Sequence, residues 1–472
     1  MTITSPRRRD ADYIFYELTR SICPTCKQTI DAQILLKDGR VIMKKRCPDH
    51  GWFEALVSSD AEHYVNSLKY NKPGSMPLAY STEIVDGCPT DCGLCPQHQQ
   101  HTCLALIEVN SHCNLDCPIC FADAGPGYSL TMEQVDGMLD RFIELEGEAE
   151  VVQFSGGEPT IHPQILEMVT LAKAKGIRHV MINTNGIRIA RDDRFLEGLK
   201  EANPVVYLQF DGFEERTSKI IRGKALLKDK LLALDRMAEA GIDAILVPAI
   251  EKGVNDHEVG AIVEFGIKHP AVRGVAFQPV THAGRYVDFD PMDRTTIPDV
   301  IKGIADQTKG MFRSDDFVPV PCCHPSCRVA TYAYIDGDEV TPLPRVLDVD
   351  DYLDYVSNRT LPDPSLDVRR ALEALWSASA VPGSDKTAYD LQCAACDVSA
   401  WPVTVADLKE KVFMIVIQSF ADPYTMDLKQ LMKCCVGVLV PDGRMIPFCA
   451  YNSVGYREQV RASLSPIAVT RP

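Results

Sequence analysis

Three closely spaced cysteines, Cys113, Cys117 and Cys120, make up the stretch of this chain with the clearest chemical meaning. They follow one another as C-x3-C-x2-C within a short polar loop. Thiolates on such a loop can converge on one iron–sulfur cube, because these clusters are normally held by cysteine sulfur. A cube needs four ligands, so three thiolates leave one iron open to a small molecule. On spacing alone, half of a zinc site completed elsewhere in the chain is the alternative.

The segments on either side of the loop favour the iron–sulfur interpretation. The apolar run 104–109 predicts a buried strand that leads directly into the loop. A second apolar strand, 151–154, is followed by Gly156, Gly157 and Glu158. Two glycines let the backbone approach a ligand closely, and a carboxylate beside them can hold an ammonium group. A zinc site would need neither feature.

Together, the stretch 104–125 and the Gly-Gly-Glu segment resemble the signature motifs of radical S-adenosylmethionine (SAM) enzymes. The resemblance implies that Cys113, Cys117 and Cys120 hold a catalytic [4Fe–4S] cluster whose open iron is chelated by the methionine part of SAM. It also implies that residues 156–158 bind the SAM amino group. Reductive cleavage of SAM would then give a 5′-deoxyadenosyl radical, which removes hydrogen from an unactivated carbon.

The region after the loop alternates between strands and helices. Strands are predicted near 179–183, 205–210, 244–250 and 274–278, with helical stretches such as 228–240 between them. With the two strands described above, this gives six strands and predicts an α/β fold with a parallel sheet. A partial (β/α)6 barrel of the TIM type is typical of radical SAM cores, so the resemblance implies that architecture.

In such a barrel, the chemistry takes place at the carboxyl ends of the strands. Four polar residues fall at predicted strand ends after the Gly-Gly-Glu segment. We therefore expect Thr184, Asn185, Gln209 and Gln278 to bind the cofactor together with residues 156–158. Asn185-Gly186 is equally consistent with a plain turn.

The N-terminal cysteines indicate a mononuclear metal site. Cys23 and Cys26 form one knuckle, and Cys47 and His50 form another. The segment between them, 32–43, alternates like a hairpin and contains an Asp-Gly turn. Three cysteines and one histidine complete a tetrahedron for iron or zinc, as in rubredoxin-like and zinc-ribbon domains. If His50 is instead a free surface histidine, the fourth ligand comes from elsewhere.

Two further groups of cysteines predict auxiliary clusters. One repeats the spacing C-x3-C-x2-C, but no apolar strand leads into it and a fourth cysteine follows, which would close the cluster. We expect this group to hold an auxiliary [4Fe–4S] cluster, with zinc as the alternative: Cys88, Cys92, Cys95 and Cys103. A second auxiliary [4Fe–4S] cluster is expected to draw on two C-terminal segments, with one cysteine of each adjacent pair left structural: Cys322, Cys323, Cys327, Cys434, Cys435 and Cys449. Cys393 and Cys396 have no assigned role.

Composition limits the partners and the location of the protein. The 472 residues carry a net charge of −16, which argues against an extended nucleic-acid interface. No window reaches the ~18 apolar residues of a membrane span, and the N-terminus lacks the apolar core of a signal peptide. The 18 cysteines cluster at metal-ligand spacings, which favours a reducing compartment over disulfides. We therefore expect a soluble, cytoplasmic protein.

The order of the motifs predicts four regions: a rubredoxin- or zinc-ribbon-like metal domain (1–75), an auxiliary-cluster segment (76–103), the radical SAM core (104–320) and a cysteine-rich C-terminal domain (321–472). This order resembles the archaeal and bacterial radical SAM family that includes tetraether lipid synthase. The resemblance implies C–C bond formation on lipid-like chains, drawn into an elongated apolar cavity. It also implies a reducing partner such as ferredoxin or flavodoxin.

Three alternatives remain open at this point. A radical SAM methylase acting on a small molecule would also transfer the methyl group of SAM, and nothing in the sequence separates it from the coupling enzyme. The methylase would need a compact pocket with hydrogen-bonding walls, whereas a lipid chain would need a long apolar one. An iron–sulfur electron-transfer scaffold and a zinc-ribbon interaction protein are the other two; the Gly-Gly-Glu segment argues against the scaffold.

Overall fold

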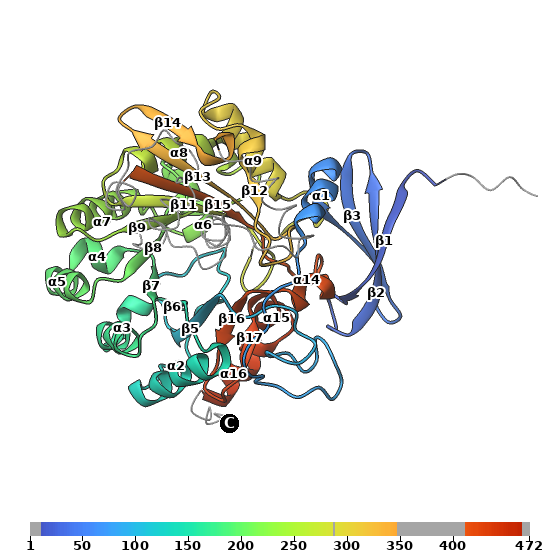
Figure 1. The fold of residues 1–472 in the computed structure, drawn as a ribbon, viewed down its shortest axis with the longest axis horizontal. Coiled ribbons are helices and arrows are strands. Elements are labelled where there is room, and N and C mark those ends of the chain that lie inside the picture. Colours follow the sequence, from blue (N-terminus) through green and yellow to red (C-terminus); the bar gives the residue numbers. More distant parts are fainter. Residues whose placement is uncertain (1–10, 287, 347–410, 465–472) are drawn as a thin grey trace, which may run out of the picture.

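The computed structural model of the protein describes residues 11–286, 288–346 and 411–464. A four-stranded antiparallel sheet forms a lobe of its own at one end (Figure 1). Its strands are β1 (Ile14–Ile22), β2 (Thr29–Lys37), β3 (Arg40–Cys47) and β4 (Gly51–Ser58). The β2–β3 hairpin turns at Asp38 and Gly39, both with positive φ, which confirms the Asp-Gly turn. Helix α1 (Ala61–Ser67) follows the lobe, and the Asp60 side chain caps it.

A second, larger sheet forms the body of the protein. Six of its strands are parallel neighbours, and all six match the sequence prediction: β5 (Leu104–Asn110), β6 (Val151–Gly156), β7 (His179–Thr184), β8 (Val205–Gln209), β9 (Ala244–Val247) and β11 (Val272–Pro279). Two C-terminal strands extend the parallel array. Strand β15 (Val412–Gln418) pairs with β11, and β16 (Val436–Leu439) pairs with β5 at the opposite edge.

The C-terminal region therefore adds strands to both edges of the core sheet. The domain boundary predicted at residue 321 falls within this single sheet. Further strands continue the sheet past β15 and β16 or pair with its members: β10 (Ala249–Ile250), β12 (Val318–Pro319), β13 (Arg328–Asp336), β14 (Glu339–Pro342) and β17 (Met445–Pro447). Within the described ranges, no strand pairing joins the two edges, and the sheet is open. An open parallel sheet is compatible with the expected partial barrel.

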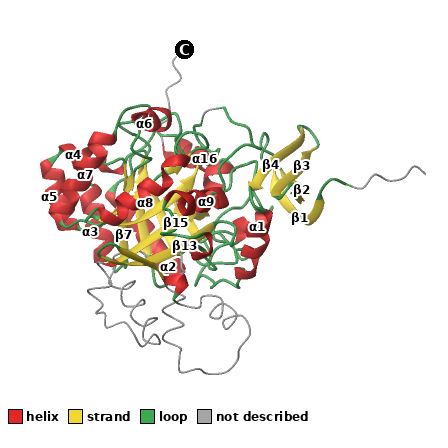
Figure 2. Cartoon of the chain, turned by 90° about the horizontal axis from the view of Figure 1, so that it is seen from above, coloured by secondary structure: helices red, strands yellow, loops and turns green. Residues whose placement is uncertain are grey.

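Helices cover the outer face of this sheet, and the largest group lies at the far end from the four-stranded lobe (Figure 2). They are α2 (Met132–Glu146), α3 (Ile165–Ala174), α4 (Ile187–Arg191), α5 (Asp193–Ala202), α6 (Glu215–Arg222), α7 (Leu227–Ala240), α8 (Val259–Lys268) and α9 (Ile297–Gln307). Three short C-terminal helices lie near β16: α14 (Leu428–Met432), α15 (Phe448–Ser453) and α16 (Tyr456–Leu464). A capping box formed by Thr131 and Gln134 starts α2.

Alternate residues of each parallel strand point to opposite faces of the sheet. One set packs beneath the helices, as Phe154 of β6 and Leu208 of β8 do with Phe142 of α2 in the main apolar core. The other set faces inward and surrounds the cavity described below. Among the helices in the described ranges, none is both long and apolar enough to cross a bilayer.

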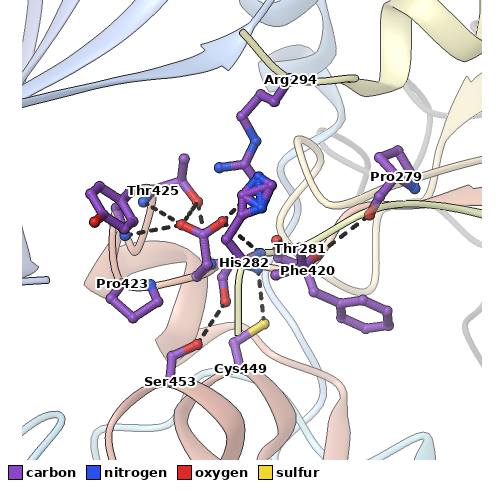
Figure 3. Close-up of polar contacts among 12 residues, drawn as sticks. Pro279, Thr281, His282, Arg294, Phe420, Pro423, Thr425, Cys449 and Ser453 are labelled. Carbon is purple, nitrogen blue, oxygen red and sulfur yellow. Dashed lines mark hydrogen bonds and ion pairs between the residues drawn. The ribbon is translucent and has the colours of Figure 1, made fainter. Parts of the chain in front are cut away.

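A buried ion pair joins the core to the C-terminal region (Figure 3), and the lobe bonds to the residue next to it. Asp422 is fully buried and accepts a hydrogen bond from Arg294 over 2.7 Å. Its carboxylate also accepts the backbone N–H groups of His282 and Thr425. From the lobe, Lys45 donates to the carbonyl oxygen of Pro423 at 2.7 Å. The junction therefore depends on one carboxylate that comes from the C-terminal region.

We expect Asp422→Asn to lower the free energy of unfolding by about 3–5 kcal/mol at neutral pH, because the change leaves Arg294 buried without its counter-charge. Burial opposes ionisation, yet Arg294 lowers the pKa of Asp422 to about 2, against 3.8 for an ordinary aspartate. The ion pair therefore stabilises the protein above about pH 4 and is lost as the pH falls toward 2.

Urea unfolding measured across this pH range tests the prediction, with Asp336→Asn as the control. Asp336 makes an ion pair with Lys411 in which both side chains are largely exposed, so its replacement should cost at most about 1 kcal/mol. Equal stability of Asp422→Asn and the unchanged protein at neutral pH would contradict this role.

Candidate active site and metal centres

The carboxyl ends of the parallel strands surround a cavity of about 210 Å³. Cys113, Cys117 and Cys120 line one side of it, and Gly156 and Gly157 line the floor beside them. The C-terminal region lines another side. The structure therefore brings the predicted cysteines and the predicted glycines to one place.

The end of β6 is bonded directly to the cysteine loop. The backbone N–H of Gly157 donates to Asn110 at 2.9 Å, and that of Glu158 donates to His112 at 2.8 Å. A Cβ at Gly157 would lie 2.0 Å from the His112 carbonyl oxygen, and one at Gly156 would lie 2.2 Å from that of Asn110. Both positions require glycine because two backbone segments meet there.

Glu158 does not act as the sequence suggested. Its carboxylate does not line the cavity and is 1% exposed as a residue. It accepts hydrogen bonds from the Thr160 hydroxyl and the Thr184 hydroxyl, each at 2.6 Å, and from the backbone N–H of Asn185 at 2.8 Å. These hydrogen bonds make the carboxylate fix the ends of β6 and β7, and they hold it buried and turned away from the cavity. The backbone of the glycine pair faces the cavity instead.

The other predicted cofactor residues divide into two groups. Asn185, Gln209 and Gln278 line the cavity, and the Asn185 amide donates to Asn114 of the cysteine loop at 2.7 Å. Thr184 is fully buried behind the site and bonds Glu158. Its role is to position the strand end, so we do not place it in contact with the cofactor.

Three arginines that the sequence did not single out hold the cysteine loop from the opposite side. Arg285 exchanges backbone hydrogen bonds with Cys120 at 2.7 and 2.9 Å, and its guanidinium bonds the carbonyl of Ala124. From α16, Arg457 and Arg461 donate to the carbonyl of Ala122. No local pattern marks these residues, because each lies far along the chain from the loop.

A fourth arginine lies inside the cavity wall near the cysteines. Arg222 makes a bidentate ion pair with Asp211 over 2.7 Å, and both side chains are buried. Burial opposes its charge, yet Asp211 and the nearby Cys117 raise the pKa of Arg222. The guanidinium therefore stays charged beside the cysteine loop, with Asp211 as its buried counter-ion.

The three loop thiols fit a cubane cluster better than a single ion. Burial raises the pKa of Cys113 to about 12 and also raises that of Cys117, so metal binding must displace protons from them. In the described part of the chain, these three sulfurs do not all lie within 4.8 Å of one another. A [4Fe–4S] cluster needs this wider spacing, and the three thiols would supply three of its four ligands at the cavity wall.

The predicted mononuclear site forms in the N-terminal lobe. The ligand atoms of Cys23, Cys26, Cys47 and His50 all lie within 4.8 Å of one another. Burial opposes ionisation of Cys23, yet the backbone N–H groups of Cys26 and Thr25 lower the pKa of its thiol to about 7. Four converging ligands of this kind suit a tetrahedral zinc or iron ion.

The structure corrects the predicted first auxiliary cluster. Cys88, Cys92 and Cys95 line a small pocket together, but Cys103 is not among its lining residues. The Cys103 thiol instead lies within 4.8 Å of those of Cys322 and Cys435. Cys103 immediately precedes β5, and the pairing of β5 with β16 places it next to the C-terminal region. Sequence spacing placed it with its nearest neighbours, whereas strand pairing separates them.

The C-terminal cysteines also divide differently from the prediction. The thiol of Cys323 contacts those of Cys322 and Cys435, so the adjacent pair 322–323 points to one place. Cys434 instead contacts Cys449, with Cys327 lining the same pocket as both. Adjacent cysteines 434 and 435 thus belong to different contact groups, although both residues line this pocket. Residues 393 and 396 lie outside the described residues.

Comparisons with known proteins agree with this site. The model of the radical SAM superfamily matches residues 107–266, and that of an HMPTM N-terminal zinc ribbon domain matches residues 15–59. A 7,8-dihydro-6-hydroxymethylpterin dimethyltransferase from Methanocaldococcus jannaschii is 35% identical, with 95% of each chain covered. The chain belongs to the radical SAM superfamily. At full length, this radical SAM enzyme belongs to the family of the M. jannaschii protein.

Other relatives of this radical SAM enzyme share only part of it. A GTP 3′,8-cyclase from Chlorobaculum tepidum is 34% identical over 37% of this chain and 53% of its own. Among solved structures, Streptococcus suis SuiB bound to its precursor peptide SuiA has a TM-score of 0.36 and 16% identity, over 41% of this chain and 44% of its own. Native anSMEcpe with bound AdoMet and a peptide has a TM-score of 0.35 and 18% identity, over 43% and 58%.

These comparisons correct the family expected from the order of the cysteine motifs. The relative that matches at full length is a pterin dimethyltransferase, whereas the motif order had suggested tetraether lipid synthase. The comparisons give no support to lipid biosynthesis and favour the methylase alternative. The zinc-ribbon assignment and the radical SAM assignment are confirmed.

Proposed function

We propose that this radical SAM enzyme is a methyltransferase that acts on a reduced pterin, a flat heterocycle rich in hydrogen-bonding groups. The full-length relationship to a pterin dimethyltransferase supports the reaction class. The lining of the cavity supports the choice of substrate, since polar amides lie among its apolar and aromatic side chains and a lipid chain would leave these amides unpaired.

Five amide side chains form a belt around the cavity. One comes from each of five strands: Gln153 of β6, Asn183 of β7, Gln209 of β8, Gln278 of β11 and Gln418 of β15. The sequence analysis had selected Gln209 and Gln278 as cofactor residues and had missed the other three. Alternation along each strand turns all five toward the interior.

Two members of the amide belt have unused acceptors. The side-chain oxygens of Asn183 and Gln209 are buried and find no hydrogen-bond partner among the described residues. Each such oxygen costs about 1–3 kcal/mol when it is left unpaired. A hydrocarbon chain would leave both unpaired, whereas the amino and ring N–H groups of SAM and of a pterin can satisfy them. The belt therefore suits two polar ligands bound side by side.

An aromatic wall lies next to the amide belt. Phe121 and Phe448 stack with ring centroids 5.1 Å apart, and Phe420 packs on Phe448 at 4.6 Å. All three side chains line the cavity. A planar ring can stack on such a wall while its edge bonds the amides. This combination of flat apolar and polar surfaces favours a heterocycle as substrate.

When bound at the cysteine loop, a [4Fe–4S] cluster supplies the electron that cleaves SAM. For a substrate R–H, the overall reaction consumes two SAM and two electrons from a reductant such as ferredoxin or flavodoxin. It gives R–CH3, methionine, 5′-deoxyadenosine and S-adenosylhomocysteine, so the removed hydrogen ends on 5′-deoxyadenosine. The chain's own residues hold the loop through Arg285, place SAM against the glycine pair and enclose the substrate beneath Phe448.

We expect Gln209→Met to raise the KM for the reduced pterin about 10-fold, because a thioether of similar length cannot accept the substrate N–H. Initial rates at varied pterin, with SAM saturating, measure this effect. Gln459→Leu is the control, since that amide is exposed on α16 and its loss should leave the KM unchanged. An unchanged KM in Gln209→Met would contradict the belt's role in substrate binding. If Gln209→Met weakens only the affinity for SAM, Gln209 binds the cofactor, as expected from the sequence.

A further inference from the structure

Three chain segments meet at a group of buried cysteines outside the active site. Cys103 lies at the start of β5, Cys322 and Cys323 precede β13, and Cys435 precedes β16. The backbone N–H of Cys103 donates to the carbonyl of Cys435 at 2.9 Å. Strand pairing and this hydrogen bond fix the positions of the two cysteines.

The spacing of the sulfurs distinguishes a single ion from a cubane. Four thiolates at about 2.3 Å around one ion lie about 3.8 Å apart, because the edge of a tetrahedron is about 1.6 times the bond length. A cubane holds its cysteine sulfurs roughly 6 Å apart, since irons and sulfides lie between them. The sulfurs of Cys103, Cys322 and Cys435 are all within 4.8 Å of one another, and Cys323 contacts the last two.

The protein itself contains a reference for each spacing. In the N-terminal lobe all four zinc-ribbon ligands lie within this distance of one another, whereas here three sulfurs do and Cys323 lies beside them. The loop cysteines at 113, 117 and 120 do not form such a group in the described part of the chain, and neither do those at 88, 92 and 95. The Cys103 group therefore resembles the ribbon site and differs from the loop that belongs to the radical SAM motif.

The surroundings carry the positive charges and donors that a tetrathiolate needs. Four thiolates on a divalent ion leave two negative charges. The buried guanidinium of Arg328 and the amine of Lys433 interact electrostatically with Cys322 and Cys323. The side-chain amide of Gln100 donates to the Cys103 sulfur at 3.8 Å. Donors of this kind stabilise bound thiolates and tune the metal.

We propose that Cys103, Cys322 and Cys435 bind one thiophilic divalent ion, Zn²⁺ or Fe²⁺, with the neighbouring Cys323 as the fourth ligand that completes the tetrahedron. This second mononuclear site ties the C-terminal region to the first strand of the core. It also holds Arg328, which begins β13 and lines the cavity. The two auxiliary clusters expected from the sequence are then left with the cysteines at 88–95 and with Cys327, Cys434 and Cys449.

Metal analysis of the anaerobically isolated full-length protein, combined with Mössbauer spectroscopy of its iron, tests the site. We expect two mononuclear ions per chain, one in the ribbon and one here. Cys322→Ser should lose about one mononuclear ion and keep all cubane iron. Cys434→Ser is the matched control, because this neighbour of Cys435 belongs to another group and should keep both mononuclear ions.

Two results would overturn the proposal. Loss of about four irons from Cys322→Ser with both mononuclear ions retained would show a cubane at this site. Unchanged metal content in that variant would show that the group binds no metal. If Cys322→Ser does not fold, Cys323→Ser gives the same reading. The ribbon variant Cys26→Ser should lose its own ion only, which separates the two mononuclear sites.

Discussion

Replacing Cys117 by alanine reduces the formation of 5′-deoxyadenosine to background. The thiol is one of three on the loop that line the cavity, and two thiolates do not retain a cubane with a defined open iron. The variant should also lose about four irons per chain while the ribbon ion remains. Anaerobic assays with dithionite and SAM, together with iron analysis, measure both effects.

Asp116→Ala is the control for this experiment. Asp116 lies in the same loop with a side chain that is 91% exposed, and its ion pair with Arg285 is a surface one that contributes little. Its loss should therefore leave iron content and SAM cleavage nearly unchanged. Turnover of Cys117→Ala at the rate of the unchanged protein would refute the assignment of the loop.

Gly157→Ala abolishes productive SAM binding although it adds only one methyl group. The new Cβ would lie 2.0 Å from the backbone oxygen of His112, and backbone cannot move aside as a flexible side chain can. Either the loop or the end of β6 must shift, which separates the cluster from the floor of the SAM site. We expect SAM cleavage to fall about 100-fold or more, since a displacement of about 1 Å has this effect on reacting groups.

Gly137→Ala provides the matched control. Gly137 lies within α2, and a Cβ there meets nothing within 4 Å. This alanine should raise stability by up to about 1 kcal/mol, because alanine is a better helix former than glycine, with SAM cleavage unchanged. Normal SAM affinity in Gly157→Ala would show that the close approach at the loop is unimportant.

Local patterns in the sequence predicted the elements and the residues that act next to one another in the chain. The strand before the cysteine loop and the hairpin of the ribbon each depend on a few adjacent residues, and both were confirmed. The ribbon ligands were also predicted, because two short knuckles bring them together. Such features depend on spacing within one segment, and spacing can be read from the chain.

Contacts between distant segments could not be predicted in this way. Cys103 was assigned to the nearest cysteines, yet the pairing of β5 with β16 carries it to Cys435. Arg285 and Arg457 hold the cysteine loop from positions that have no motif. The carboxylate of Glu158 was expected to face SAM, but hydrogen bonds to Thr160, Thr184 and Asn185 turn it into the protein. Each error concerned a contact that depends on how the chain folds and not on spacing within one segment.

The amide belt shows the same limit for the substrate. Gln153, Asn183 and Gln418 are ordinary strand residues until alternation and sheet order turn them toward one cavity. Motif order alone had favoured an apolar lipid substrate. The amide belt and the full-length relative together favour a pterin.

The transfer of a deuterium-labelled methyl group from SAM tests the central claim most directly. The reconstituted enzyme is incubated anaerobically with labelled SAM, a reductant and either 7,8-dihydro-6-hydroxymethylpterin or a saturated lipid chain. The masses of the products are then measured by mass spectrometry. We predict a pterin that carries the labelled methyl group, with 5′-deoxyadenosine formed alongside and the lipid unchanged. A coupled lipid product without label, with the pterin unmodified, would contradict the proposed function.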